Sequence, residues 1–179
     1  MSYLKFDRRL MANLDESTQR EYIRTNRKGA YCCSSIVGCN TRKYHGVLVI
    51  PVPELSENNH VLLSSLDLTI VQHGVPFNVG IHEYEGDIFS PKGHKYIREY
   101  NVDIASSTTY RVGGVVLQKE FLFCHYTNRM LQRYTLLEAH SRTTLRLSPF
   151  LAFRDVKMLT HRNDQYHGDY GQAKSGVTF

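Results

Sequence analysis

The chain has 179 residues, 41% of them apolar, which is enough for one domain that buries about 70% of the surface its unfolded form exposes. No apolar run approaches the roughly 20 residues needed to cross a bilayer, so we expect no membrane partner. The net charge of +5 comes from basic residues scattered along the chain, a pattern that favours an ordinary solvated surface over a nucleic-acid partner.

The N-terminus and the cysteines predict a cytoplasmic location. Charged residues between Lys5 and Arg9 interrupt the first apolar stretch, so it lacks the unbroken hydrophobic segment of a secretory signal. The four cysteines contain no CxxC pair, and the adjacent Cys32 and Cys33 would point to opposite faces of an extended chain. We therefore expect reduced thiols in a reducing compartment.

One short helix is predicted near the N-terminus, around Asp15 to Tyr22. Thr18 and Glu21 have the spacing of a capping box, and Asp15 adds a further capping side chain. From Tyr22 onward, β-branched and aromatic residues occur in short runs separated by turn residues, which predicts strands.

The strand signals continue to the end of the chain. The clearest runs lie at 47–50, 61–71, 115–123, 130–137 and 143–151. His73-Gly74 and Gly113-Gly114 predict tight hairpins, because glycine takes the positive φ angles that two-residue loops need. The result is a pair of largely antiparallel sheets. Residues 177–179 resemble the start of another strand, so we expect a piece of a longer protein in which some edge strands lack neighbours.

Metal, nucleotide and nucleophile chemistry find little support. There are no paired ligands at zinc spacing and no glycine-rich phosphate loop, so we expect no metal and no cofactor. Cys39 and His45 could form a nucleophile and base, but buried structural thiols explain them better. Glu83, Glu85 and Asp87 could supply an acid and a base, although a solvated loop explains them better.

The stretch GCNTRKYHGVLVI, residues 38–50, carries the main candidate site. Asn40, Arg42, Tyr44 and His45 stand directly before a strand whose burial fixes the backbone, so their side chains would be held rigidly. Polar groups beside an aromatic ring suit a sugar, which presents hydroxyls and an apolar ring face. The alternative is a turn that needs its glycine and asparagine only for backbone reasons. The residues themselves leave both interpretations open.

Several segments resemble one known family in the same order along the chain. They are TNRKGAY (25–31), GCNTRKYHGVLV (38–49), LLSSLDLTI (62–70), FSPKGHKYIREYNVD (89–103), VLQKEFLF (116–123) and SPFLAFRDVKMLTHRN (148–163). Together they resemble the N-terminal domain of bacterial and archaeal glycogen debranching enzymes of the amylo-α-1,6-glucosidase type.

The resemblance implies a mainly β fold, a large twisted antiparallel β-sandwich of the supersandwich type, incomplete in this chain and carrying one short N-terminal helix. Residues 1–179 would form a single N-terminal domain, and the parent enzyme would continue into an (α/α)6 barrel whose two carboxylates hydrolyse α-1,6 branch linkages with inversion. Those carboxylates are not in this sequence, so we expect no catalytic residue here. The implied partners are that barrel and glycogen or another branched α-glucan.

By the same resemblance, the substrate-binding or interdomain residues are Asn26, Asn40, Arg42, Tyr44, His45, Arg154 and Asp155. We expect Arg154 and Asp155 to act as a paired, orienting unit near the same edge. The chain departs from the family at Arg27-Lys28, Cys32-Cys33 and Lys157, where the family shows GL, AS and histidine.

Two alternatives to glucan contact remain open. In the first, the motif side chains only satisfy buried backbone groups and hold the domain to the barrel, because buried polar groups are usually paired. In the second, the chain is a stand-alone carbohydrate-binding β-sandwich module that works without a barrel.

Overall fold

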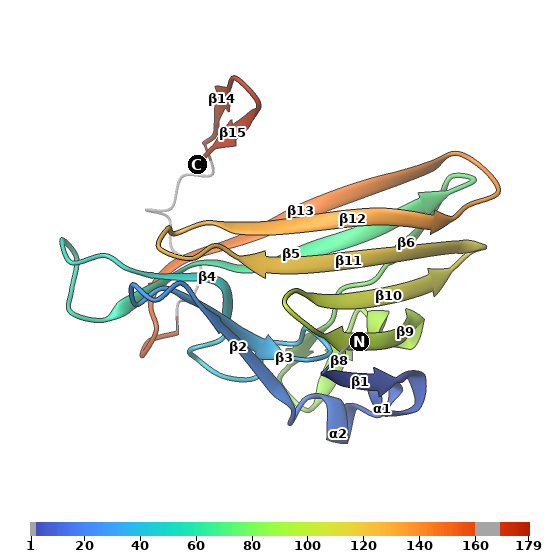
Figure 1. Ribbon diagram of the computed structural model, residues 1–179, viewed down its shortest axis with the longest axis horizontal. Coiled ribbons are helices and arrows are strands. Elements are labelled where there is room, and N and C mark those ends of the chain that lie inside the picture. Colours follow the sequence, from blue (N-terminus) through green and yellow to red (C-terminus); the bar gives the residue numbers. More distant parts are fainter. Residues whose placement is uncertain (1–2, 160–168) are drawn as a thin grey trace.

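The computed structural model describes residues 3–159 and 169–179 and contains two large antiparallel sheets packed face to face (Figure 1). Sheet A has the order β1-β9-β10-β11-β12. Its strands are β1 (Leu4–Asp7), β9 (Ile97–Val102), β10 (Ser106–Val112), β11 (Val115–Phe123) and β12 (Met130–Glu138).

Sheet B has the order β13-β5-β4-β3-β2, and β6 pairs with β5 beside that path. Its strands are β2 (Glu21–Thr25), β3 (Tyr31–Ser35), β4 (Gly46–Pro51), β5 (Asn59–Gln72), β6 (Val75–Asn78) and β13 (Thr143–Asp155). Figure 1 shows β13 and β5 running behind β12 and β11, so the two sheets form the layers of a sandwich.

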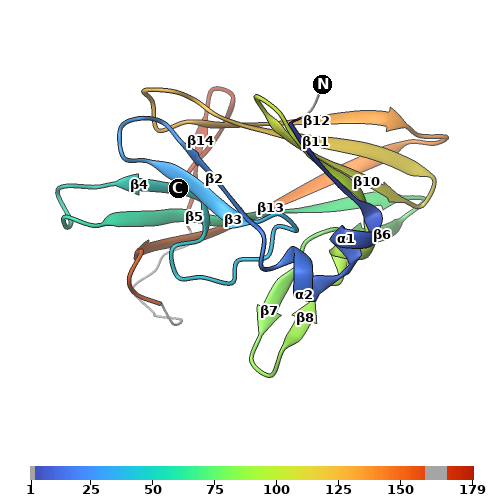
Figure 2. The same ribbon diagram turned by 60° about the horizontal axis from the view of Figure 1, so that its bottom comes forward.

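Two small hairpins and a short 3-10 helix complete the strands and turns. They are β7 (His82–Tyr84) with β8 (Ile88–Ser90), β14 (Gly171–Ala173) with β15 (Gly176–Thr178), and η1 (Gly93–Tyr96). Figure 2 shows the β7–β8 hairpin projecting from the body near α2, and β15 confirms the strand predicted at the end of the chain. The HEYEGD segment thus forms a hairpin with exposed carboxylate side chains.

The two hairpins predicted from glycine are confirmed. Gly113 and Gly114 both have positive φ angles, 57° and 80°, and the flanking register pairs the last residue of β10 with the first of β11. His73 and Gly74, with φ angles of 51° and 78°, make the same kind of turn between β5 and β6. Positive φ at both central residues matches the right-handed twist of the strands that they join.

The core lies between the two sheets. Alternate residues of β11 are buried against sheet B: Leu117 packs in one cluster with Leu68 and Ile70, and Phe121 in another with Cys32. This alternation is the period-two pattern by which the sequence predicted the strands. The prediction of a mainly β, antiparallel sandwich is confirmed, whereas the extent of the domain stays a prediction.

The short helix predicted around Asp15 to Tyr22 is confirmed only at its start, and a second short helix precedes it. The structure has two short helices, α1 (Arg8–Ala12) and α2 (Leu14–Ser17), and Glu21 begins strand β2. The carboxylate of Asp7 accepts a hydrogen bond from the N–H of Leu10 (3.0 Å), which starts α1 earlier than predicted. Tyr22 packs inward against aromatic residues of sheet A, so tertiary packing outweighs the local capping pattern.

None of the described helices is long and apolar enough to span a membrane.

We expect Gly93→Ala to lower the free energy of unfolding by about 1–3 kcal/mol. The N–H of Gly93 donates to the carbonyl oxygen of Gly80 (3.0 Å), and an added Cβ would overlap backbone atoms of Val79 and Gly80. Gly176→Ala is the matched control, because a Cβ there meets no atom within 4 Å. Urea unfolding of both variants measures the difference, and equal stability would contradict this packing.

Candidate functional site

The loop from Gly38 to His45 fills a gap in sheet B. Strand β4, which lies between β3 and β5, begins only at Gly46. On the side of the sheet before Gly46, no strand separates β3 from β5. The amide nitrogen of Asn40 donates to the carbonyl oxygen of Ser64 on β5 (2.9 Å), and its amide oxygen accepts from the hydroxyl of Ser34 on β3 (2.7 Å). The side chain of Asn40 therefore joins the two strands in place of β4.

The carboxylate of Glu21, on β2, gathers three of the predicted site residues. The hydroxyl of Tyr44 donates to Oε2 of Glu21 (3.0 Å), and Nε of Arg42 lies 3.4 Å from Oε1. Nε2 of His45 lies 3.3 Å from the same Oε1, within ion-pair distance but without the alignment of a full hydrogen bond. One carboxylate thus ties the loop to the edge strand of sheet B.

His45 is fully buried, and its hydrogen bonds fix its protonation. The N–H of Thr41 donates to Nδ1 of His45 (3.0 Å), so Nδ1 carries no proton and the neutral ring holds its proton on Nε2, facing Glu21. Burial lowers the pKa of His45 below 6.5, although the carboxylate of Glu21 raises it and opposes that effect. The ring is therefore neutral at physiological pH.

A possible metal cluster at this place conflicts with that protonation. Glu21, Cys33 and His45 place their ligand atoms within 4.8 Å of one another, a spacing that one zinc ion could bridge. A metal needs an unprotonated ring nitrogen, but the N–H of Thr41 already occupies the lone pair of Nδ1. The neutral ring then carries its proton on Nε2, at the place where a metal ion would lie. The cluster therefore suits a neutral histidine, hydrogen-bonded through Nδ1, better than a metal ligand.

The cysteines near the loop are poorly suited to act as nucleophiles. Burial and, to a smaller extent, the nearby charge of Glu21 raise the pKa of Cys33 to about 11. Burial likewise raises the pKa of Cys39 to about 11 and that of Cys32 to about 12. Because the thiolate is the reactive form, these thiols are inert at neutral pH.

Arg154 and Tyr31 hold the outer end of the loop. Nη2 of Arg154, on β13, donates to the carbonyl oxygen of Lys43 (2.7 Å), and Nη1 donates to that of Met158 (2.8 Å). The hydroxyl of Tyr31, on β3, donates to the carbonyl oxygen of Tyr44 (3.1 Å). Residues far apart in sequence therefore satisfy the backbone carbonyls of the loop.

Asp155 and Asn26 lie outside this cluster. The carboxylate of Asp155 accepts from the amide of Asn58 (2.8 Å) and the N–H of Lys157 (2.8 Å), so its side chain does not pair with Arg154. Asn26 is fully buried in the turn between β2 and β3, where its amide nitrogen donates to the carbonyl oxygen of Thr127 (3.1 Å). Both residues fasten neighbouring segments together.

The predicted site thus separates into an internal part and an exposed part. Asn40, His45 and Arg154 are engaged with groups of the protein itself, as described above. Tyr44 is 43% exposed, and the side chain of Arg42 is 56% exposed. The surface formed by Arg42 and Tyr44, which we call the Tyr44 surface, is the part of the site that a ligand or another domain can reach.

Sequence reasoning missed Glu21, the residue on which the Tyr44 surface depends. Glu21 has the spacing of a capping-box residue after Thr18, and nothing in its local pattern links it to a loop about twenty residues later. Only the pairing of β2 with β3 brings Glu21 opposite Ser35 and beside the loop.

The fold and the site together define a β-sandwich that displays an aromatic and basic surface on a rigid loop. The family model described as glycogen debranching enzyme N terminal matches residues 20–179. The chain therefore belongs to that family, and the resemblance stated from its motifs is confirmed. Neither the curated proteins nor the solved structures compared with the chain gave a match.

We expect the free energy of unfolding to fall as the pH is lowered below about 6.5. The folded-state pKa of His45 is lowered by burial, so the unfolded chain takes up a proton first and stability is lost on acidification. Each such histidine adds a slope of at most about 1.4 kcal/mol per pH unit. Burial, with Lys95 and Lys92, lowers the pKa of His94 in the same direction.

His45→Gln should therefore reduce the slope without abolishing it, because the contribution of His94 remains. His140→Gln makes the same substitution at an exposed position and is the matched control. Urea titrations at a series of pH values measure both variants. A slope that His45→Gln leaves intact would show that His45 is not buried in its neutral form.

Proposed function

We propose that this chain is the noncatalytic N-terminal domain of a glycogen debranching enzyme that hydrolyses α-1,6 branch linkages. In this proposal it packs on the (α/α)6 catalytic domain of the same polypeptide, and the Tyr44 surface contacts the branched α-glucan. Membership of the glycogen debranching enzyme N-terminal family supports the proposal at the level of the enzyme.

The observation that carries glucan contact is the rigid exposure of the Tyr44 ring. Its hydroxyl donates to Glu21, its own carbonyl oxygen accepts from Tyr31, and its ring meets His45 edge-on with centroids 5.1 Å apart. The exposed ring and the Arg42 guanidinium beside it are therefore ordered before a ligand arrives. Such an ordered aromatic and polar pair suits the apolar ring face and the hydroxyls of a sugar, with little entropy lost on binding.

Packing on a second domain is supported by the exposed apolar residues of β13. Leu145 and Leu147 pair with Ile70 and Leu68, which are buried in the core, yet they are 36% and 45% exposed. Phe150, on the opposite face of the same strand, is 47% exposed. A strand whose inward-facing residues remain exposed is suited to being covered by another domain.

A stand-alone carbohydrate-binding module would use the same Tyr44 surface, but it would leave these residues of β13 in water. The domain proposal therefore accounts for more of the structure.

A cytoplasmic location, also part of the proposal, is supported by the four cysteines, all free and three of them buried.

We expect Tyr44→Ala to weaken the binding of branched maltooligosaccharides by about fivefold, because a stacked aromatic contributes about 1 kcal/mol. Isothermal titration calorimetry on the complete enzyme that carries this domain measures the change. Tyr84→Ala, which removes a tyrosine of similar exposure on β7, is the matched control and should bind normally.

Tyr44→Phe distinguishes contact with the glucan from a purely structural role. The variant keeps the ring but loses the hydrogen bond to Glu21, so binding should stay near the wild-type value while the free energy of unfolding falls slightly. Normal glucan affinity in a correctly folded Tyr44→Ala variant would refute glucan contact and leave only the role in packing.

We expect the purified 179-residue chain to release no glucose from a branched limit dextrin, because the proposal places both catalytic carboxylates in the partner domain. A coupled glucose assay measures the release, and the complete enzyme serves as the positive control. Release that survives further purification would overturn the noncatalytic assignment.

A further inference from the structure

A lysine occupies a position of β11 that its neighbours use for the core. Leu117 and Phe121 are 0% and 7% exposed and face sheet B. Lys119 lies between them with the same parity, so its side chain also points into the sandwich. Its cross-strand neighbours are Thr108 on β10 and Tyr134 on β12.

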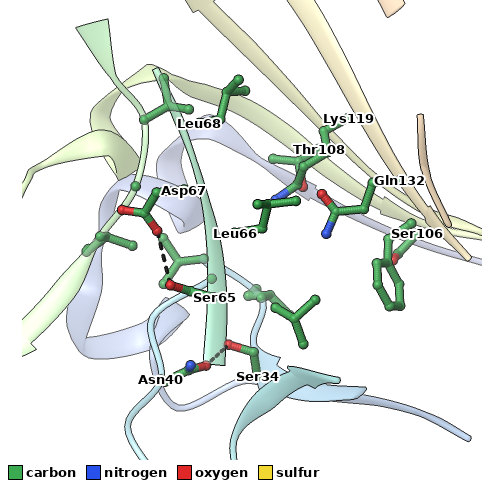
Figure 3. A pocket seen from close by; sticks show the side chains of 18 of the residues that line it. Ser34, Asn40, Ser65, Leu66, Asp67, Leu68, Ser106, Thr108, Lys119 and Gln132 are labelled. Atoms are coloured by element: carbon green, nitrogen blue, oxygen red, sulfur yellow. Dashed lines mark hydrogen bonds between the residues drawn. The ribbon is translucent and has the colours of Figure 1, made fainter. Parts of the chain in front are cut away.

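The side chain of Lys119 reaches a cavity between the two sheets with a volume of about 80 Å³. Sheet B contributes Ser34 and Leu66 to the lining, and sheet A contributes Thr108, Gln132 and Lys119. Figure 3 shows Lys119, Thr108 and Gln132 pointing from sheet A toward Leu66. The cavity is therefore polar on the side of sheet A.

Among the residues that the structure describes, no carboxylate lies within ion-pair distance of the Lys119 ammonium. Asp67 lines the same cavity, but both of its carboxylate oxygens have other partners. Its Oδ1 accepts a hydrogen bond from the hydroxyl of Ser65 (3.2 Å; Figure 3), and its Oδ2 lies 2.8 Å from Nε2 of His82. Its charge is therefore directed to other partners.

The ammonium of Lys119 is charged at neutral pH. Burial by itself lowers its pKa, but the phenol groups of Tyr110, Tyr134 and Tyr100 raise it, and the net shift is upward. Neutral phenols can accept a hydrogen bond from an ammonium but do not neutralise it. Lys119 is only partly buried, and a positive charge that is partly withdrawn from water is stabilised when an opposite charge meets it.

Buried hydroxyl groups also line the cavity. Tyr100 is 3% exposed, and its hydroxyl lies near Ser106 without the geometry of a full hydrogen bond. Ser106 and Thr108 add two more buried hydroxyls to the lining. The cavity thus combines one cation with several hydrogen-bond donors, the combination that binds an oxyanion.

We propose that the cavity between the sheets binds a small inorganic oxyanion of the phosphate class, held by the ammonium of Lys119 and the hydroxyls of Thr108 and Tyr100. The volume supports this ligand. A volume of about 80 Å³ is several times the roughly 10–15 Å³ that holds one water molecule, so a tetrahedral oxyanion fits in the cavity. This site is separate from the Tyr44 surface and does not rest on the function proposed for that surface.

The proposal is tested by thermal unfolding of the 179-residue chain in millimolar sodium phosphate, with sodium chloride keeping the ionic strength constant. The expected result is a rise in Tm that saturates with phosphate concentration, since binding to the folded state alone stabilises it by mass action. General exclusion of phosphate from protein surfaces also raises Tm, but without saturation.

Lys119→Met should weaken phosphate binding by about tenfold or more, because it removes a charge-assisted hydrogen bond without emptying the space. The exposed Lys28 gives the matched control of equal charge change, and Lys28→Met should respond like the wild type. Thr108→Val removes one hydroxyl at nearly constant volume and should weaken binding by a smaller factor. It keeps the test valid if Lys119→Met does not fold.

Two results would overturn the proposal. One is a wild-type chain whose Tm shows no saturable rise with phosphate. The other is a saturable rise of equal midpoint in the wild type and in folded Lys119→Met or Thr108→Val, which would place the anion elsewhere.

Discussion

The structure depends on how loop 38–45 replaces β4 between β3 and β5. Buried backbone groups must be paired, and leaving one unpaired costs about 1–3 kcal/mol. Asn40 meets this constraint by bridging the two strands, and His45 meets it by accepting the N–H of Thr41. Gly46 then lets β4 begin in a crowded place, because a Cβ there would lie 2.9 Å from side-chain atoms of both Val49 and Val61.

The same contacts decide which motif residues face outward. The carboxylate of Glu21 lies on the outer side of the loop, so the groups that reach it, Arg42 and Tyr44, remain partly exposed while His45 is buried between them. The motif therefore has buried residues, which pair with groups of the protein itself, and partly exposed residues, on which the proposed glucan contact rests.

Local patterns predicted most of the strands but erred where packing overrides them. The paired glycines at 113–114 and the alternation along β11 predicted their hairpin and strand correctly, because both signals act within a few residues. The capping pattern around Thr18 failed because Tyr22 gains more from the core than from a helix. Lys119 breaks the apolar alternation of β11, and its neighbours in sequence do not reveal the cavity that it faces.

The sequence by itself determined the mainly β class, the turns and the family, because alternation, glycine turns and ordered motifs are properties of the chain read in one direction. Tertiary contacts were needed to show that Glu21 holds the Tyr44 surface and that Arg154 donates to the loop carbonyl and does not pair with Asp155. They also show that no carboxylate of the described residues lies within ion-pair distance of Lys119. The physical reason is that hydrogen bonds and desolvation depend on distances between residues whose separation in the sequence carries no information about them.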